Sequence, residues 1–309
     1  MRPSQRSSLA SSRLVVMKNS GVILVSSNCM TAGIALSLKA LLPDYEIETA
    51  HMRSFLDMSS HEVGQRLAHV DIWVTGVTDQ SVVDLGAHIQ TIRIPRLIFD
   101  AYHPDIAYAR DAAGTLIKGV GDSEYHSAIV LWCHQNGVSP QQCAQLFTPE
   151  TFARIGYVGR WAQAVTNLRA LFDVGDLAFD DFFPAMMELS PFMHAFNHPT
   201  APAVTRLAKL VACKITGDRG LLSLPIERSI QDTLALDTIW PIYPGVADHY
   251  GLRGAYLWKI GAGLFFRTPA DFVDASYAAY KGADSAEWEV SRMDRALFDR
   301  VLPERVSLQ

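Results

Sequence analysis

Hydrophobic residues form short continuous runs in the first third of the chain, and each run is bounded by polar residues or glycine. Such runs are typical of strands buried on both faces of a parallel sheet. They predict strands over 22–26, 45–50, 71–76 and 94–100. Between them, apolar residues recur at helical spacing over 31–42, and over 59–70, which opens with serines suited to capping. This alternation predicts a small, parallel, doubly wound sheet.

Beyond about residue 125 the pattern changes to one helix after another. Helices are predicted over 126–137, 148–172, 201–217, 268–280 and 285–301. Two of them open with Thr-Pro, at Thr148 and Thr268, where threonine can cap the helix and proline suits its first turn. The predicted fold class is therefore α/β, with the sheet in the N-terminal third embedded in a principally helical fold. We expect residues 17–125 and 126–309 to pack as one compact unit.

Composition and charge narrow the class of protein. Of 309 residues, 49% are hydrophobic, which is typical of a globular protein. The formal net charge is -5, so the composition gives no excess of basic residues that would indicate a nucleic-acid partner. No run of roughly 18 apolar residues predicts a transmembrane helix. The four cysteines lack zinc-type spacing, and without a secretory signal we expect reduced thiols in a cytoplasmic protein. Residues 1–16 are interpreted as a disordered or non-native extension, with a transit peptide as the alternative.

Polar residues follow the predicted strands where each strand ends. They are Ser26, Ser27, Asn28 and Cys29 on the first strand, His51 on the second, Thr75 and Gly76 on the third, and Asp100, Tyr102, His103 and Asp105 after the fourth. In open parallel sheets, ligands bind at this edge. The first helix also begins there, so its N-terminus would favour an anion or oxyanion and lower the pKa of the Cys29 thiol. The alternative is a small buried cysteine, and no glycine-rich nucleotide loop is present.

Histidines that precede prolines are candidate general bases. His103 is expected on an exposed turn, with Asp105 or Asp100 orienting its ring. The alternative is a structural turn in which Asp105 caps the following segment. Asn197 and His198 form a second turn of this kind, which can face the first across a cleft. Metal binding was also considered for His51, His61, His103 and His198, but their spacing matches no zinc motif and no metal is expected.

Basic and aromatic residues are interleaved in the predicted helix 148–172. They are Arg154, Tyr157, Arg160, Trp161 and Arg169. On a shared face they can stack an adenine and pair with phosphates. The alternative is an amphipathic helix with snorkelling arginines. Residues 243–259 contain the glycines and cations of a ligand loop, which is a weak signal.

Three stretches together resemble one family. ILVSSNCM resembles a strand followed by Gly-Asn-Cys-Gln, FDAYHPDIAY resembles a Tyr-His-Pro-Asp segment, and SPFMHAFNHP resembles a Phe-Asn-His-Pro segment. In this order they are similar to WcbI-type capsular polysaccharide biosynthesis enzymes, over about residues 20 to 280. The sequence departs from the first motif at Ser27, where glycine is expected, and at Met30, where glutamine is expected.

The resemblance implies a cradle-like fold that holds coenzyme A in a deep pocket, and acetyl transfer from acetyl-coenzyme A to a sugar hydroxyl. The acceptor would be a sugar or polysaccharide precursor, and a capsule-biosynthesis partner protein is left open. Residues and resemblance together place catalysis on Cys29, His103, Asp105 and His198. They place coenzyme A binding on Ser27, Asn28, Cys29, Met30, Tyr102, Arg160 and Asn197.

The leading hypothesis is an O-acetyltransferase. In it, His103 deprotonates the hydroxyl, and the helix terminus at Asn28 and Cys29 stabilises the oxyanion. In a variant of this hypothesis, Cys29 accepts the acyl group as a nucleophile. One alternative is an SGNH-like esterase or thioesterase, suggested by Ser26 and Ser27, although the Gly-Asp-Ser-Leu motif is missing. Another is a non-catalytic accessory protein that binds coenzyme A.

Overall fold

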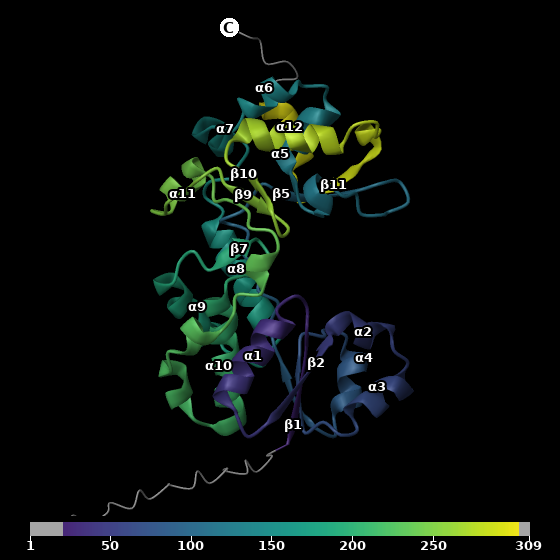
Figure 1. Ribbon diagram of the computed structural model, residues 1–309, viewed down its shortest axis with the longest axis vertical. Helices are drawn as coiled ribbons and strands as arrows, with labels where there is room; N and C mark the ends of the chain where they lie inside the picture. The colour runs from purple at the N-terminus through teal and green to yellow at the C-terminus, as the bar shows by residue number, and fades with distance from the viewer. Residues whose placement is uncertain (1–20, 303–309) are drawn as a thin grey trace, which may run out of the picture.

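The computed structural model describes residues 21–302, which form two lobes joined along one side (Figure 1). The extension predicted at residues 1–16 lies outside the described residues. One lobe is built on a parallel sheet of four strands in the order β2-β1-β3-β4. They are β1 (Val22–Ser27), β2 (Glu46–His51), β3 (Ile72–Thr75) and β4 (Gln90–Arg93).

Helices cover both faces of this sheet (Figure 1). On one face α1 (Thr31–Leu41) packs against α10 (Ala201–Thr216). On the other face lie α2 (Met52–Asp57), α3 (Ser60–Leu67) and α4 (Gln80–Val83). Burial of both faces explains why the two central strands, β1 and β3, are continuous apolar runs. The predicted serine cap is confirmed, because Ser59 and Glu62 form a reciprocal capping box at the start of α3.

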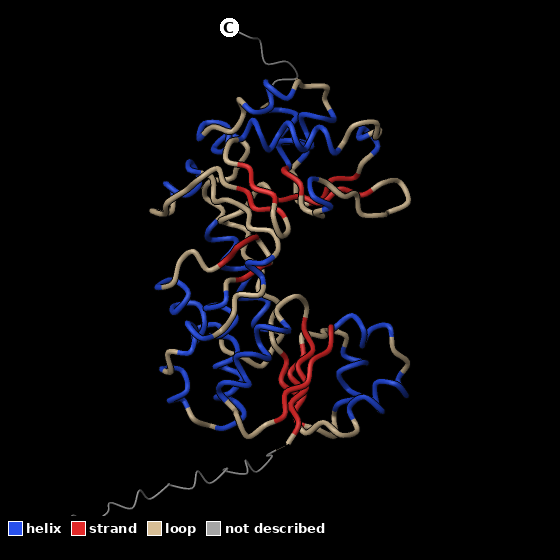
Figure 2. Tube along the Cα trace, viewed as in Figure 1, coloured by secondary structure: helices blue, strands red, loops and turns tan. Residues whose placement is uncertain are grey.

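The other lobe combines short helices with small antiparallel sheets (Figure 2). Its helices are α5 (Ala128–Gln135), α6 (Pro140–Ala144), α7 (Pro149–Arg154), α11 (Pro244–His249), α12 (Pro269–Ala279) and α13 (Arg295–Val301). Its strands are β5 (Ile106–Arg110), β6 (His126–Ser127), β9 (Trp258–Ile260), β10 (Leu264–Phe266) and β11 (Glu289–Ser291). The remaining elements are α8 (Trp161–Asp173), α9 (Phe179–Glu188), β7 (Met193–Ala195) and β8 (His198–Pro199). The predicted fold class is confirmed: a small N-terminal parallel sheet sits in a principally helical, cradle-like chain.

The prediction of the fourth strand is wrong. The fourth strand is β4, and residues 94–100 continue from it as an extended segment outside the sheet. The Ile94 N–H still donates to the Thr75 carbonyl (2.8 Å), but Pro95 has no N–H to continue the ladder. Further along, the Phe99 N–H donates to the Phe196 carbonyl (2.7 Å). The segment therefore leaves the sheet and joins it to the rest of the molecule.

Two of the predicted helices are also wrong in part. The stretch 148–172 is divided into α7 and α8, because Gly156 and Gly159 between them adopt positive φ angles of 73° and 80°. Within 285–301 only α13 is an α-helix, and β11 precedes it, paired with β5. The predictions over 31–42, 201–217 and 268–280 are confirmed by α1, α10 and α12. The stretch 126–137 contains α5, preceded by β6.

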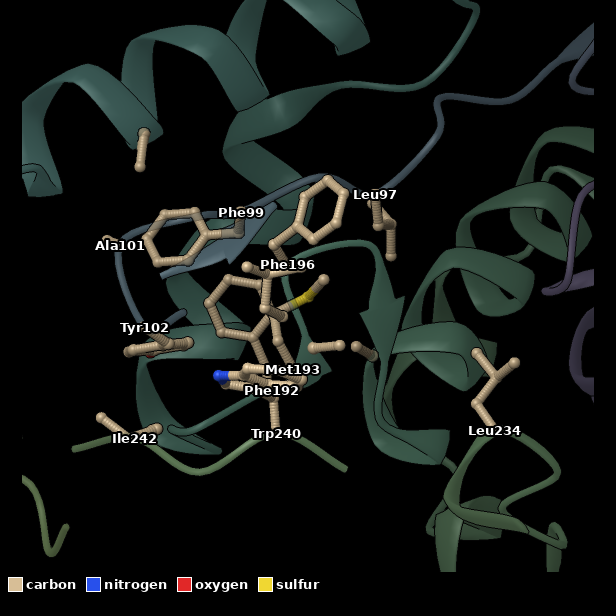
Figure 3. Close-up of a cluster of buried hydrophobic side chains, with 14 of the residues drawn as sticks. Leu97, Phe99, Ala101, Tyr102, Phe192, Met193, Phe196, Leu234, Trp240 and Ile242 are labelled. Atoms are coloured by element: carbon tan, nitrogen blue, oxygen red, sulfur yellow. The ribbon is translucent and has the colours of Figure 1, made fainter. Parts of the chain in front are cut away.

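An aromatic cluster fills the region where segment 94–100 meets the other elements (Figure 3). Phe99 is its centre: its ring lies 5.1 Å from those of Tyr102 and Trp161 and 5.0 Å from that of Phe192. Buried residues of the sheet and of the helical lobe belong to the same hydrophobic core. The division of the chain near residue 125 stays a prediction.

Candidate functional site

The corner at the end of β1 begins with two buried serines. The Ser26 hydroxyl lies 2.9 Å from Thr75 Oγ1 and accepts a hydrogen bond from Trp73 Nε1 (2.8 Å). Ser27 is buried, and its hydroxyl donates to Asn28 Oδ1 (3.4 Å). Both serines are therefore part of the internal packing of the sheet edge, and neither presents a free hydroxyl to solvent.

Asn28 organises the turn from β1 into α1. Its side-chain oxygen accepts from the Met30 N–H (3.2 Å), and its carbonyl accepts from the Thr31 N–H (3.0 Å). Thr31 Oγ1 in turn accepts from the Ser27 N–H (3.1 Å). Met30 is buried, and its side chain anchors the turn in the hydrophobic core. These bonds leave Cys29 as the exposed residue of the corner.

The pKa of Cys29 is shifted in the direction opposite to the prediction. Burial of the sulfur itself raises this pKa to about 11, although other parts of the residue are exposed. The N–H groups of Cys29 and Met30 favour the thiolate, but by less, and the Asp237 carboxylate opposes it. The protein therefore carries a neutral thiol at neutral pH, which does not favour a nucleophilic role.

A polar pocket of about 410 Å³ is the next feature of the site, and none of residues 26–31 lines it. Its lining includes Tyr108, Tyr125, Asn197, His198 and Asp237. Tyr125 and Asp237 also interact electrostatically with the Cys29 thiol, so part of the pocket lining lies within electrostatic range of the thiol. The lining thus comes from β5, from the segment before β6, from the β7–β8 hairpin and from the segment before β9.

A directed chain of hydrogen bonds crosses the pocket wall. Tyr125 donates its hydroxyl hydrogen to Asn197 Oδ1 (2.6 Å), and Asn197 Nδ2 donates to the Tyr108 hydroxyl (3.3 Å). The Tyr125 oxygen also lies 3.1 Å from His198 Nε2. Because its hydrogen is already donated to Asn197, this oxygen can only accept a hydrogen bond from the histidine. This assigns the His198 hydrogen to Nε2 and a lone pair to Nδ1.

The environment of His198 favours a neutral imidazole with its lone pair on Nδ1. Burial lowers its pKa below the ordinary range. Its Nδ1 atom is buried and has no hydrogen-bond partner within residues 21–302. The same holds for His103 Nδ1, but of the two histidines only His198 lines the pocket, which makes its Nδ1 the candidate acceptor for a substrate hydroxyl.

His103 does not occupy the exposed turn that the sequence predicts. It is 1% exposed, donates a ring hydrogen to the Trp240 carbonyl, and burial lowers its pKa to about 3. Asp105 and Asp100 do not orient it. Asp105 accepts from the hydroxyls of Tyr157 and Tyr243 (2.6 Å each), while Asp100 pairs with Arg160 (3.3 Å) and Arg292 (3.9 Å). The His-Pro-Asp segment is thus a buried structural centre, in which both aspartates are paired, while His103 Nδ1 has no hydrogen-bond partner within residues 21–302.

Asp105 provides a prediction about pH. Burial raises its pKa to about 6 from an ordinary value of 3.8, against hydrogen bonds from Ser127, Tyr157, Tyr243 and the Ile129 N–H. The folded state therefore holds this proton more tightly, and the associated stabilisation is lost as the pH rises from about 4 to about 6. Compared with Asp105→Asn, the free energy of unfolding of the wild type should fall by about 3 kcal/mol between these limits. Urea unfolding of both proteins at several pH values measures this difference, and a pH-independent difference would contradict the assignment.

Three other residues singled out by the sequence have structural contacts and do not line the pocket. Tyr102 is buried and its hydroxyl lies 2.7 Å from that of Ser190; burial raises its pKa to about 12. His51 ends β2 and accepts a hydrogen bond from the Arg53 N–H that caps α2. Lys259 of the predicted loop 243–259 donates to three backbone carbonyls.

The interleaved basic and aromatic residues share no common face. Tyr157 is buried beside Asp105, Arg154 donates to the Val301 carbonyl, and Arg169 stacks over Phe179. The two-helix structure of this stretch separates them. Residues 21–302 contain no group of three or more His, Cys, Asp or Glu side chains arranged to hold a metal ion.

Comparison with known families identifies the chain. The model of the family described as "Polysaccharide biosynthesis enzyme WcbI" matches residues 22–217. The chain belongs to the WcbI family. It is therefore a member of a family of polysaccharide biosynthesis enzymes. No curated protein matches the chain.

A solved WcbI structure shares the fold. It superposes with a TM-score of 0.64 at 16% sequence identity, over 91% of this chain and 94% of that chain. That structure is described as a novel polysaccharide biosynthesis enzyme, in its native form without a disulfide bond between coenzyme A and one of its cysteines. Within residues 21–302 of this WcbI-family chain, no helix is both long enough and apolar enough to cross a membrane.

Proposed function

We propose that this WcbI-family chain is an O-acetyltransferase that moves an acetyl group from acetyl-coenzyme A to a sugar hydroxyl in capsular or exopolysaccharide biosynthesis. The observation that carries the proposal is the pocket that His198 lines, because the Nδ1 atom of His198 has no partner and Asp237 of the same lining interacts electrostatically with the Cys29 thiol. The description of the solved relative names a disulfide bond between coenzyme A and a cysteine, which that form of the protein lacks. Among the cysteines described here, Cys29 is the exposed one.

His198 is the proposed general base. Its Nδ1 atom accepts the proton of the acceptor hydroxyl as that oxygen attacks the thioester carbonyl. The bond from the sugar oxygen to the acyl carbon forms, the carbon–sulfur bond breaks, and His198 returns the proton to the departing thiolate. Tyr125 holds the ring in place through Nε2, which makes it a positioning residue. The N–H groups of Cys29 and Met30, which face the Cys29 sulfur, are the proposed site of the thioester carbonyl.

A thermal-shift screen tests whether coenzyme A is the ligand. Coenzyme A, acetyl-coenzyme A, NAD, ATP and nucleotide sugars are compared at matched concentrations. A ligand at 100 times its dissociation constant stabilises the fold by roughly 2.7 kcal/mol. We expect this stabilisation with coenzyme A and its acetyl thioester. Stabilisation by the other compounds alone would contradict the proposal.

We predict that Cys29 holds the thioester and does not attack it. Its raised pKa leaves little thiolate at neutral pH. Cys29→Ala should therefore retain turnover to within about tenfold, whereas loss of a true nucleophile costs many orders of magnitude. The half-buried Cys213 provides the control variant Cys213→Ala. An acetylated enzyme trapped without acceptor, and absent in Cys29→Ala, would show instead that Cys29 is the nucleophile.

Two other functions have less support. A serine esterase or thioesterase requires an available hydroxyl, but Ser26 and Ser27 are buried and hydrogen-bonded. A non-catalytic accessory protein would bind coenzyme A without turnover with any acceptor. The unpartnered Nδ1 of His198 favours catalysis over that function.

A further inference from the structure

The pocket that His198 lines has an acidic rim. Carboxylates come from Asp122, Glu124 and Asp237, whereas Lys118 supplies the one ammonium group of the lining and pairs with Glu124 (2.6 Å). The other lining groups are neutral hydroxyl, amide and imidazole groups. Negative charge therefore exceeds positive charge around the opening.

This charge indicates which of the two substrates, coenzyme A or the sugar, the pocket can bind. The phosphate groups of coenzyme A would be repelled by the carboxylates of Asp122 and Asp237. Carboxylates can instead accept hydrogen bonds from the hydroxyls of a sugar, and amides can both accept hydrogen bonds from them and donate to them. The His198 base lies in the same lining, so a sugar hydroxyl bound there meets the group that deprotonates it.

The rim is built in advance of any ligand. Gly121 and Asp122 both adopt positive φ angles, of 60° and 58°, and strain of this kind at a non-glycine residue persists only where neighbours enforce it. A Cβ at Gly121 would lie 2.7 Å from Leu264 Cδ1, so the turn is pressed against the β9–β10 hairpin. The Gly119 N–H closes the turn on the Ser123 carbonyl (2.8 Å).

The opposite side of the rim is fixed by a lysine. Lys259 Nζ donates to the carbonyls of Leu236 (2.8 Å), Asp237 (2.6 Å) and Gly261 (2.7 Å). These bonds hold the backbone that carries the Asp237 carboxylate. Both acidic sides of the pocket are thus preorganised, which lowers the ordering cost of binding.

We propose that this pocket is the acceptor site and that its acidic rim restricts the acceptor to sugars without a negative charge, namely neutral or amino sugars. This inference rests on the proposed function and specifies its substrate class. The reaction is the transfer described above, with the attacking hydroxyl held between the rim and His198 Nδ1.

Saturation-transfer NMR on the full chain with saturating coenzyme A tests the proposal. The probes are the methyl glycosides of glucose, glucosamine and glucuronic acid. We expect the glucoside and the glucosaminide to bind, and the glucuronide to bind roughly tenfold more weakly, which corresponds to one charge repulsion in a partly screened site. The double variant Asp122→Asn, Glu124→Gln removes two carboxylates and should abolish this discrimination. Asn at position 122 tolerates the positive φ angle.

The control is Asp57→Asn, at the exposed end of α2 on the far face of the sheet, which should leave the discrimination unchanged. Glucuronide binding as tight as glucoside binding in the wild type would overturn the proposal. So would binding of coenzyme A with no binding of any glycoside. Failure of coenzyme A itself to bind would instead overturn the proposed function, so the two failures are distinguishable.

Discussion

Replacing His198 by Gln is expected to reduce acetyl transfer by a factor of about 100 or more. The glutamine amide can still donate to the Tyr125 oxygen, as His198 Nε2 does at 3.1 Å, so the hydrogen-bond chain through Asn197 to Tyr108 is kept. What disappears is the free lone pair on Nδ1. Steady-state kinetics should show the loss in kcat, with little change in stabilisation by coenzyme A.

His103→Gln is the matched comparison. His103 is buried and bonded to the Trp240 carbonyl, so this change should lower stability while turnover per folded molecule changes by no more than a few fold. The two variants separate the histidine proposed to act from the one that the sequence favoured. Normal turnover in His198→Gln, or a hundredfold loss confined to His103→Gln, would contradict the account.

Replacing Phe99 by Ala is expected to destabilise the fold by about 3–5 kcal/mol. Phe99 is 1% exposed, and its ring contacts that of Trp161 as well as those of Tyr102 and Phe192, which Figure 3 labels. The cavity would open where segment 94–100 bonds to Phe196, the residue before Asn197. Urea unfolding measures the change.

The exposed Phe265 gives a control for the Phe99 variant. Its side chain is 56% exposed, so Phe265→Ala should change the free energy of unfolding by no more than about 0.5 kcal/mol. A destabilisation of Phe99→Ala no larger than that of Phe265→Ala would show that the cluster does not support the junction. We also expect ligand-bound Phe99→Ala to regain part of its stability, since coenzyme A binds only the folded state.

The sheet could be predicted because its signals are local. The central parallel strands are continuous apolar runs, and the rule that ligands bind at the carboxyl ends of strands directs attention to residues 26–29, whose role in binding stays a prediction. The fourth strand was placed in the wrong run because 94–100 is as apolar as a strand. What distinguishes it is Pro95 and a hydrogen bond to the distant Phe196.

The base could not be chosen from the sequence. His103 and His198 both precede a proline, and only tertiary contacts distinguish them. Asp105 is bound by Tyr157 and Tyr243, which lie 52 and 138 residues away along the chain, so its burial has no local signal. Tyr125 and Asp237 lie in irregular segments without periodicity, and their place at the pocket follows from the fold alone. The predicted lowering of the Cys29 pKa is wrong because burial of the sulfur has a larger effect than the N–H groups at the start of the helix.

Transfer of isotopically labelled acetyl from acetyl-coenzyme A to a neutral methyl glycoside tests the central claim most directly. Mass spectrometry distinguishes an acetylated glycoside from free acetate. The account predicts that label enters the glycoside as an ester, and that His198→Gln suppresses this transfer by about 100-fold or more. Release of all label as free acetate would indicate a hydrolase. Retention of all label in bound acetyl-coenzyme A, with no acetylated glycoside formed, would contradict catalysis.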